Sequence, residues 1–183
     1  VTVLDVSLTD EQSVQQAIAT ILSTTGRIDV LVNNAGISIN GVTESFTSAD
    51  VRSLFDVNVF APWNLIKEVL PSMRNQSQGF IINVTSGFGR VSFPFATMYS
   101  ASKFALEGIS EGLHYELRPL GVDVAILEPG AFPTEMAQKN SFGSDTSVNA
   151  GYTAIADIPA TMRTASGGLI QKHQANPQEV EDT

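Results

Sequence analysis

The sequence predicts an α/β fold, a doubly wound and mostly parallel sheet with helices on both faces. Strand-like and helix-like segments alternate along the chain, which is typical of open sheets with right-handed crossovers. The strand-like run Ile28–Val32 is almost wholly apolar, as expected of a strand covered on both faces. Asn33, Ser86 and Pro129 each lie just past the end of a predicted strand. Because ligands of such sheets bind at the carboxyl ends of the strands, these residues indicate a site at that edge.

The first half of the chain supplies two predicted strands and two predicted helices. Val1–Asp5 is predicted to be a strand, followed by a helix from about Asp10 to Thr24 whose apolar residues recur at helical spacing. After the strand Ile28–Val32, a longer helix is predicted from roughly Ser48 to Met73, with an interruption at Pro62.

The second half continues the alternation. Phe80–Val84 is predicted to be a strand, and the helix that contains Tyr99 is predicted to run to about Leu117, where Arg118-Pro-Leu-Gly121 stops it. Val122–Leu127 follows as a strand that ends at Glu128-Pro-Gly130.

Composition supports one globular domain and excludes several kinds of partner. With 183 residues, 43% of them hydrophobic, the chain can bury one sizeable core, and residues 1–183 are predicted to form a single domain. The net charge of −9 argues against nucleic acid or an anionic membrane as a partner. The absence of cysteine excludes disulfides and thiolate metal sites and fits a cytoplasmic location. His114 and His173 have no partners at metal-ligand spacing, so no metal site is expected.

Tyr99 and Lys103 are four residues apart in Tyr99-Ser-Ala-Ser-Lys103, a spacing that directs both side chains to one spot on a helix. A cation beside a phenol favours the phenolate, so Lys103 is expected to lower the pKa of Tyr99 from its ordinary value near 10. Ser86 ends a strand-like run thirteen residues earlier and could hydrogen-bond the same substrate oxygen. The Y-x-x-x-K pattern is short and common, so the assignment depends on the motifs around it.

Those motifs occur in a characteristic order. Asn33-Asn-Ala-Gly36 follows one strand, Asn58 lies in Phe55-Asp-Val-Asn-Val-Phe60, and Pro129-Gly130 follows another strand, with Thr134 beyond it. With Ser86 and the Tyr99–Lys103 pair, the chain from Val1 to about Thr134 resembles the short-chain dehydrogenase/reductase family in its form of roughly 250 residues. One departure is Ala61, where the family often has glycine.

The resemblance implies a Rossmann-type domain with a catalytic tetrad of Asn58, Ser86, Tyr99 and Lys103 around a nicotinamide cofactor. Tyr99 would exchange a proton with the substrate hydroxyl or carbonyl, and Ser86 would hold that oxygen. Lys103 would lower the pKa of Tyr99 and bond the nicotinamide ribose. The main-chain carbonyl of Asn58 would bind a water that leads to the lysine.

The resemblance also implies a set of residues that contact NAD or NADP. Asp5 or the Val6 amide would touch the adenine, Asn33 would lie beside a cofactor ribose, and Thr134 would contact the carboxamide. The choice between NAD and NADP stays open, because the discriminating residue follows a second strand that the sequence does not contain. The implied cofactor-binding residues are Asp5, Val6, Asn33, Ala35, Gly36, Tyr99, Lys103, Pro129, Gly130, Phe132 and Thr134.

The glycine-rich turn with which the family begins does not occur in the sequence. Val1–Asp5 corresponds to the family's third strand, and in the strand order 3-2-1-4-5-6 the first two strands separate the third from the fourth. Their absence would leave unpaired backbone beside Ile28–Val32, so the sequence is expected to be part of a longer chain. Asn176-Pro-Gln-Glu-Val180 correspondingly resembles the start of a late helix.

The substrate is constrained only weakly. Residues 131–168 resemble the family's substrate-binding lid, and their Phe and Met residues suggest an apolar alcohol or ketone. Phe88, Phe93 and Phe95 would line the same pocket. Two alternatives remain, a nucleotide-sugar epimerase or dehydratase and a non-catalytic dinucleotide sensor of the same fold. The intact tetrad favours an enzyme.

Assembly is expected because two predicted helices, Asp50–Met73 and Tyr99–Leu117, are apolar on more than one face. The resemblance implies that these helices form a homodimer interface, commonly within a homotetramer.

Overall fold

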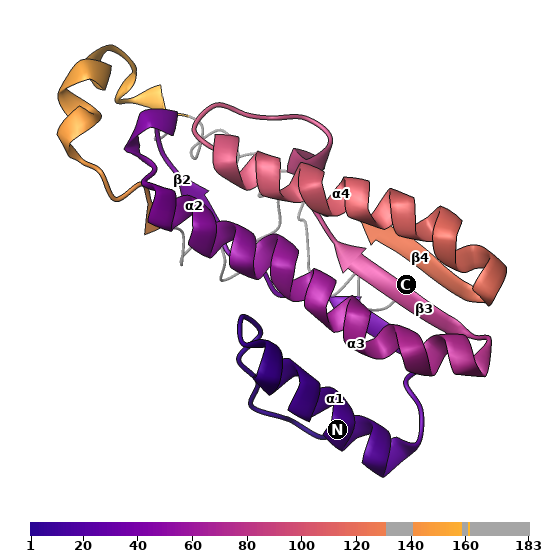
Figure 1. Cartoon of the computed structure of the whole chain (residues 1–183). Helices are drawn as coiled ribbons and strands as arrows, with labels where there is room; N and C mark the ends of the chain where they lie inside the picture. The colour runs from indigo at the N-terminus through magenta and orange to yellow at the C-terminus, as the bar shows by residue number, and fades with distance from the viewer. Residues whose placement is uncertain (131–140, 159–160, 162–183) are drawn as a thin grey trace.

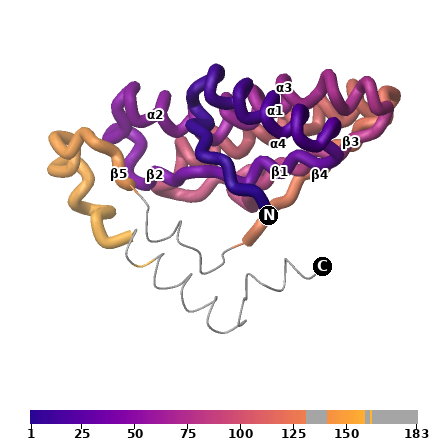
Figure 2. The backbone as a smooth tube through the Cα atoms, turned by 90° about the horizontal axis from the view of Figure 1, so that it is seen from below, coloured from indigo at the N-terminus to yellow at the C-terminus, as the bar shows by residue number. Residues whose placement is uncertain are grey.

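The computed structural model describes residues 1–130, 141–158 and 161. Its centre is a parallel sheet in the order β1-β3-β4, formed by Val30–Asn33, Gly79–Val84 and Val122–Leu127. The helices α1, α3 and α4 lie together on one side of these strands (Figure 2). The parallel α/β architecture predicted from the alternation of elements is therefore confirmed.

The register of the sheet is continuous. Val30 to Asn33 pair with Phe80 to Asn83, and Gly79 to Val84 pair with Val122 to Leu127. Alternate side chains of β3 are buried, because every second residue of a strand faces the helices. Val30, Val32, Phe80 and Leu127 remain exposed, since no described helix covers the opposite face. A second helical layer therefore stays a prediction.

The first helix, α1, spans Glu11–Thr25. The Asp10 carboxylate caps it by accepting hydrogen bonds from the amides of Gln12 and Ser13, and Gly26 ends it in the left-handed conformation at φ 76°. The helix α1 lies beside α3 (Figure 1), and Val14 and Ile18 belong to the main core.

The predicted long helix consists of α2, Ser48–Phe55, a π-helical turn, Asp56–Phe60, and α3, Ala61–Gln76. The interruption predicted at Pro62 therefore occurs just before it. Thr47 and Asp50 form a capping box that starts α2. Pro62 lies in the first turn of α3, where the missing N–H is tolerated.

The long helix α4, Thr97–Leu117, runs along β3 and β4 (Figure 1). Its residues Leu113 and Leu117 join the main core with α1 and α3, whereas Tyr99 belongs to a second cluster with Ile39 and Leu54. The buried members of this core are Val14, Ile18, Ile66, Val69, Met73, Ile81, Leu113, Leu117, Val122 and Val124.

The prediction of a strand at Val1–Asp5 is wrong for this structure. No described strand pairs with this segment, and Val1 and Val3 are fully or largely exposed. A strand needs a hydrogen-bonding neighbour, and β1 forms the edge of the described sheet. Only Val6, just beyond the segment, packs against the main core.

A second, unpredicted parallel pair joins β2, Ile39–Asn40, to β5, Ser141–Phe142. The Asp50 carboxylate accepts hydrogen bonds from the amide and hydroxyl of Ser144, at 3.1 and 2.7 Å. These bonds, with those from Thr47, lower the pKa of Asp50 to about 2. The segment after β5 is thereby attached to the start of α2.

No helix in the described part of the chain is both long and apolar enough to cross a membrane.

Candidate active site

Three parallel strands end at the same edge of the sheet. The strands β1, β3 and β4 end at Asn33, Val84 and Leu127, which places Asn33, Ser86 and Pro129 along that edge as predicted. The loops after β3 and β4 also contact each other, because the Gly87 amide donates to the Pro129 carbonyl at 3.3 Å. The loops after β3 and β4 are therefore joined at this edge.

The Tyr99 side chain is buried at the start of α4, among aromatic residues of the loop that follows Ser86. Its ring meets Phe88 edge-on at 5.7 Å, and Phe88 stacks on Phe93 at 4.7 Å. Burial raises the pKa of the Tyr99 phenol, and a hydrogen bond with Ser86 partly opposes that rise. The expected lowering of the Tyr99 pKa is therefore not found.

Lys103 is buried one helical turn beyond Tyr99, with its Nζ atom 5.8 Å from the centroid of the tyrosine ring. The ammonium donates a hydrogen bond to the Val84 carbonyl at 3.1 Å. Burial lowers the pKa of Lys103 to about 8, and the Glu107 carboxylate opposes this shift. The ammonium is directed to the end of β3, which explains why it does not dominate the pKa of the phenol.

Asn58 lies buried in the π-helical turn, a feature that is frequent at functional sites. Its side chain makes paired 2.9 Å bonds with the amide and carbonyl of Ile37, and its amide also donates to Ser102 Oγ at 3.0 Å. Since Pro62 has no N–H, the Asn58 carbonyl four residues earlier lacks an α-helical donor. The Asn58 side chain therefore connects the loop after β1 to α4. Its main-chain carbonyl receives no hydrogen bond from Pro62.

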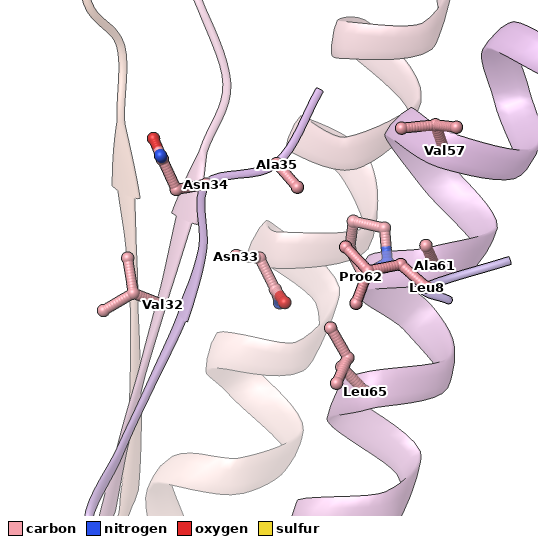
Figure 3. Close-up of a pocket in the computed structure, with 9 residues that line it drawn as sticks. All are labelled: Leu8, Val32, Asn33, Asn34, Ala35, Val57, Ala61, Pro62 and Leu65. Carbon is pink, nitrogen blue, oxygen red and sulfur yellow. The ribbon is translucent and has the colours of Figure 1, made fainter. Parts of the chain in front are cut away.

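The Asn33 side chain lies buried beneath the first predicted cofactor loop. Its amide donates to Asn83 Oδ1 at 2.8 Å, and Asn83 donates to Ser110 Oγ of α4, also at 2.8 Å. The Oδ1 atom of Asn33 is buried without a partner among the described residues. In Figure 3 the Asn33 side chain points from β1 toward α3.

A hollow next to Asn33 lies between the end of β1 and the helices (Figure 3). None of the predicted catalytic residues lines it. It therefore adjoins the predicted cofactor loop and is separate from the Ser86–Tyr99 cluster. Its lining residues are Leu8, Val32, Asn33, Asn34, Ala35, Val57, Ala61, Pro62 and Leu65.

The other predicted cofactor residues are less closely gathered. Asp5 is exposed and Val6 half-buried in the segment before α1, and Gly36 is half-buried in the loop after β1. Gly130 is exposed beyond β4. Phe132 and Thr134, like half of the predicted lid, lie outside the described residues.

Several polar residues that support the site were not predicted. Ser102, inside the Tyr99-Ser-Ala-Ser-Lys103 motif, donates to the Tyr99 carbonyl at 2.7 Å and accepts from Asn58. Asn83 is a fully buried polar residue within an apolar strand, and that interruption was its signal in the sequence. Glu107 is likewise a buried charge four residues after Lys103.

No set of three or more potential His, Cys, Asp or Glu ligands gathers within residues 1–130, 141–158 and 161. The chemistry of the site in this part of the chain consists of a phenol, a hydroxyl, an ammonium and amides.

Comparison with known proteins places this arrangement in a family. The family model described as "short chain dehydrogenase" matches residues 1–144. An uncharacterised oxidoreductase of Schizosaccharomyces pombe is 41% identical over 143 residues, 78% of the chain and 60% of the relative. A 3-ketodihydrosphingosine reductase of Bacteroides thetaiotaomicron is 41% identical over 83% of the chain and 56% of the relative. Retinol dehydrogenase 8 of Bos taurus is 38% identical over 75% of the chain and 44% of the relative.

Solved structures show the same fold. A short-chain dehydrogenase from Streptomyces avermitilis is 41% identical with a TM-score of 0.71, over 76% of the chain and 51% of the match. A metagenomic short-chain oxidoreductase in complex with NADP is 32% identical with a TM-score of 0.67, over 70% of the chain and 58% of the match. An NAD⁺-bound xylitol dehydrogenase is 27% identical with a TM-score of 0.70, over 73% of the chain and 52% of the match. The chain thus spans about half the length of the proteins it matches.

Proposed function

Because the chain belongs to the short-chain dehydrogenase family, we propose that the complete protein is an NAD- or NADP-dependent oxidoreductase that interconverts an alcohol and a carbonyl compound. The observation that carries this proposal is a buried Tyr99 phenol at the carboxyl edge of a parallel sheet, with the Lys103 Nζ atom 5.8 Å from its ring. The loop that holds Ser86 packs against Tyr99 through Phe88, whose amide donates to Ser86 Oγ. This edge is where open α/β sheets bind their ligands.

In this proposal Tyr99 is the general acid and base. Burial raises the pKa of the phenol, so Tyr99 is protonated near neutral pH and is ready to donate its proton to a carbonyl oxygen. Ser86 hydrogen-bonds the same oxygen and stabilises the negative charge that develops on it. Lys103 provides a positive charge that favours the phenolate left behind.

The residues fit a nicotinamide dinucleotide, which supplies or accepts the hydride when it is bound. Lys103 makes one hydrogen bond among the described residues, to the Val84 carbonyl, and retains donors for ribose hydroxyls. Asn33 Oδ1 is a buried acceptor without a described partner beside the predicted cofactor loop. The related solved structures hold NADP in one case and NAD⁺ in another, so either cofactor is consistent with the family.

We propose an apolar substrate. Phe88 and Phe93 stack beside Tyr99, which gives the site an aromatic wall. Two relatives that share 38% and 41% identity act, by name, on retinol and on 3-ketodihydrosphingosine. Residues 131–168 are proposed to complete this pocket.

The test is a turnover assay of the complete protein with NAD and NADP, following nicotinamide absorbance with matched apolar and polyol substrates. Each buried methylene contributes about 0.8 kcal/mol, so a few extra methylenes should raise kcat/KM by about tenfold or more. A preference for polyols would contradict the apolar pocket. Cofactor binding without turnover of any alcohol or ketone would instead support a non-catalytic sensor.

We also propose that the protein forms a homodimer or homotetramer in the cytoplasm through α3 and α4. Four aromatic side chains on this helical layer, including its π-helical start, are exposed: Phe60, Trp63, Phe104 and Tyr115. A second copy of the same helices would cover them.

For this assembly we expect Phe104→Asp to convert the complete protein to a smaller species, because a charge at a buried interface is costly. Light scattering coupled to gel filtration measures the change in mass. Phe142→Asp is the matched control, since Phe142 is also exposed but lies on β5. A parent protein that is monomeric at micromolar concentration would refute the proposed interface.

A further inference from the structure

Arg90 follows the turn Gly87–Gly89 and faces three carboxylates. Its Nε lies 2.8 Å from Glu128, its Nη1 3.2 Å from Glu111 and its Nη2 3.2 Å from Glu107. Glu128 precedes Pro129 at the end of β4, whereas Glu107 and Glu111 belong to α4. One guanidinium therefore joins the loop after Ser86, the catalytic helix and the end of β4.

Glu107 differs from the other two carboxylates because it is buried. The residue is only 4% exposed, and neither carboxylate oxygen has a described partner with hydrogen-bond geometry. Gly89 leaves the room for it, since a β-carbon at that position would lie 3.0 Å from Glu107 Cγ and Oε1. A buried carboxylate without hydrogen bonds is costly unless a charge compensates it, and Arg90 supplies that charge at 3.2 Å.

The carboxylate of Glu107 lies on the same face of α4 as Lys103, four residues away. It opposes the effect of burial on Lys103 by raising its pKa. Among the described residues, the titratable groups that face Lys103 are Glu107 and Tyr99. Arg90 faces Glu107 and is held in turn by Glu111 and Glu128.

We propose that Glu107, held in place by Arg90, is a positioning residue whose buried carboxylate keeps Lys103 in its ammonium form in the active site. This inference rests on the function proposed above for Tyr99 and Lys103. Arg90 prevents Glu107 from being left as an isolated buried charge, and its bond to Glu128 fixes the pair relative to the end of β4. The negative charge of Glu107 then acts on Lys103 one helical turn away.

The experiment compares Glu107→Gln with the matched control Glu111→Gln in the complete protein. Both substitutions remove one carboxylate from Arg90, but only Glu107 is buried on the Lys103 side of α4. The lysine side chains are labelled at Cε and titrated by NMR without substrate, and Lys103→Met identifies the Lys103 signal. The pH–rate profile of carbonyl reduction is measured in parallel.

In Glu107→Gln, the Lys103 signal should titrate roughly half a pH unit or more below its position in the parent. Glu111→Gln should leave it in place. The ratio of the Glu107→Gln rate to the parent rate should fall roughly two- to threefold from about pH 6 to about pH 8.5. The reason is that a larger fraction of Lys103 has lost its proton in the variant than in the parent at the higher pH. A general structural defect would lower the rate equally at all pH values.

If Glu107→Gln does not fold, Glu107→Met provides the same test, because it removes the charge and leaves no polar group to bury. An unchanged Lys103 titration in Glu107→Gln, or an equal shift in Glu111→Gln, would overturn this inference. The proposed function would still stand in that case, provided that the parent protein is active. A parent without turnover would instead refute the proposed function, whatever the lysine titration shows.

Discussion

Replacing Tyr99 by Phe is expected to lower the turnover number of the complete protein by about a hundredfold or more, the lower range of general acid–base catalysis. The ring keeps its edge-on contact with Phe88, at 5.7 Å between centroids, so the fold should be maintained. Only the phenolic hydroxyl and its proton are lost. Cofactor affinity should therefore change much less than turnover.

Stopped-flow measurement of hydride transfer, together with cofactor binding by calorimetry, checks this expectation. Tyr115→Phe is the matched control, because Tyr115 lies on the same helix but is 78% exposed and distant in sequence from the catalytic turn. Near-normal hydride transfer in Tyr99→Phe with a substrate that the parent turns over would rule out Tyr99 as the proton donor.

Replacing Lys103 by Met is expected to remove most of the activity and at the same time to stabilise the protein near pH 7. Burial lowers the pKa of Lys103 from 10.5 to about 8, so keeping the buried ammonium charged costs about 3 kcal/mol of folding stability. Methionine removes this charge and also the 3.1 Å hydrogen bond to Val84, which contributes about 1 kcal/mol. The net gain in unfolding free energy should be about 2 kcal/mol.

This gain has a defined pH dependence. Between about pH 8 and 10.5 the unfolded parent carries a proton on Lys103 that the folded parent has lost, so stability of the parent rises with pH. Below pH 8 both states are charged and above 10.5 both are neutral, so the contribution is constant there. The stability advantage of Lys103→Met should therefore disappear across this window.

Denaturant unfolding of both proteins at a series of pH values measures the difference. Lys67→Met is the matched control, since Lys67 is exposed on α3 and its substitution should leave stability nearly unchanged at every pH. A Lys103→Met protein that is less stable than the parent at pH 7 would show that the buried ammonium is not the unfavourable group described here.

Most of the regular elements, and the edge at which the site lies, could be predicted from the sequence alone. The strand Val122–Leu127 was predicted with the bounds that the structure gives, because apolar strand-sized runs between turn residues have few alternatives. The four-residue spacing of Tyr99 and Lys103 was enough to place both on one helical face. The positions of Asn33, Ser86 and Pro129 after parallel strands followed from the same alternation.

How these groups act on one another depends on the folded structure. Val1–Asp5 has the composition of a strand, but strand formation requires a hydrogen-bonding neighbour that local sequence does not reveal. The pKa of Tyr99 was expected to fall and instead rises, because burial acts on the phenol while the ammonium of Lys103 is directed to Val84. The meeting of Arg90 with Glu107 depends on a loop and a helix whose separation is fixed by packing. Electrostatic effects depend on distance and burial, and these are properties of the folded chain.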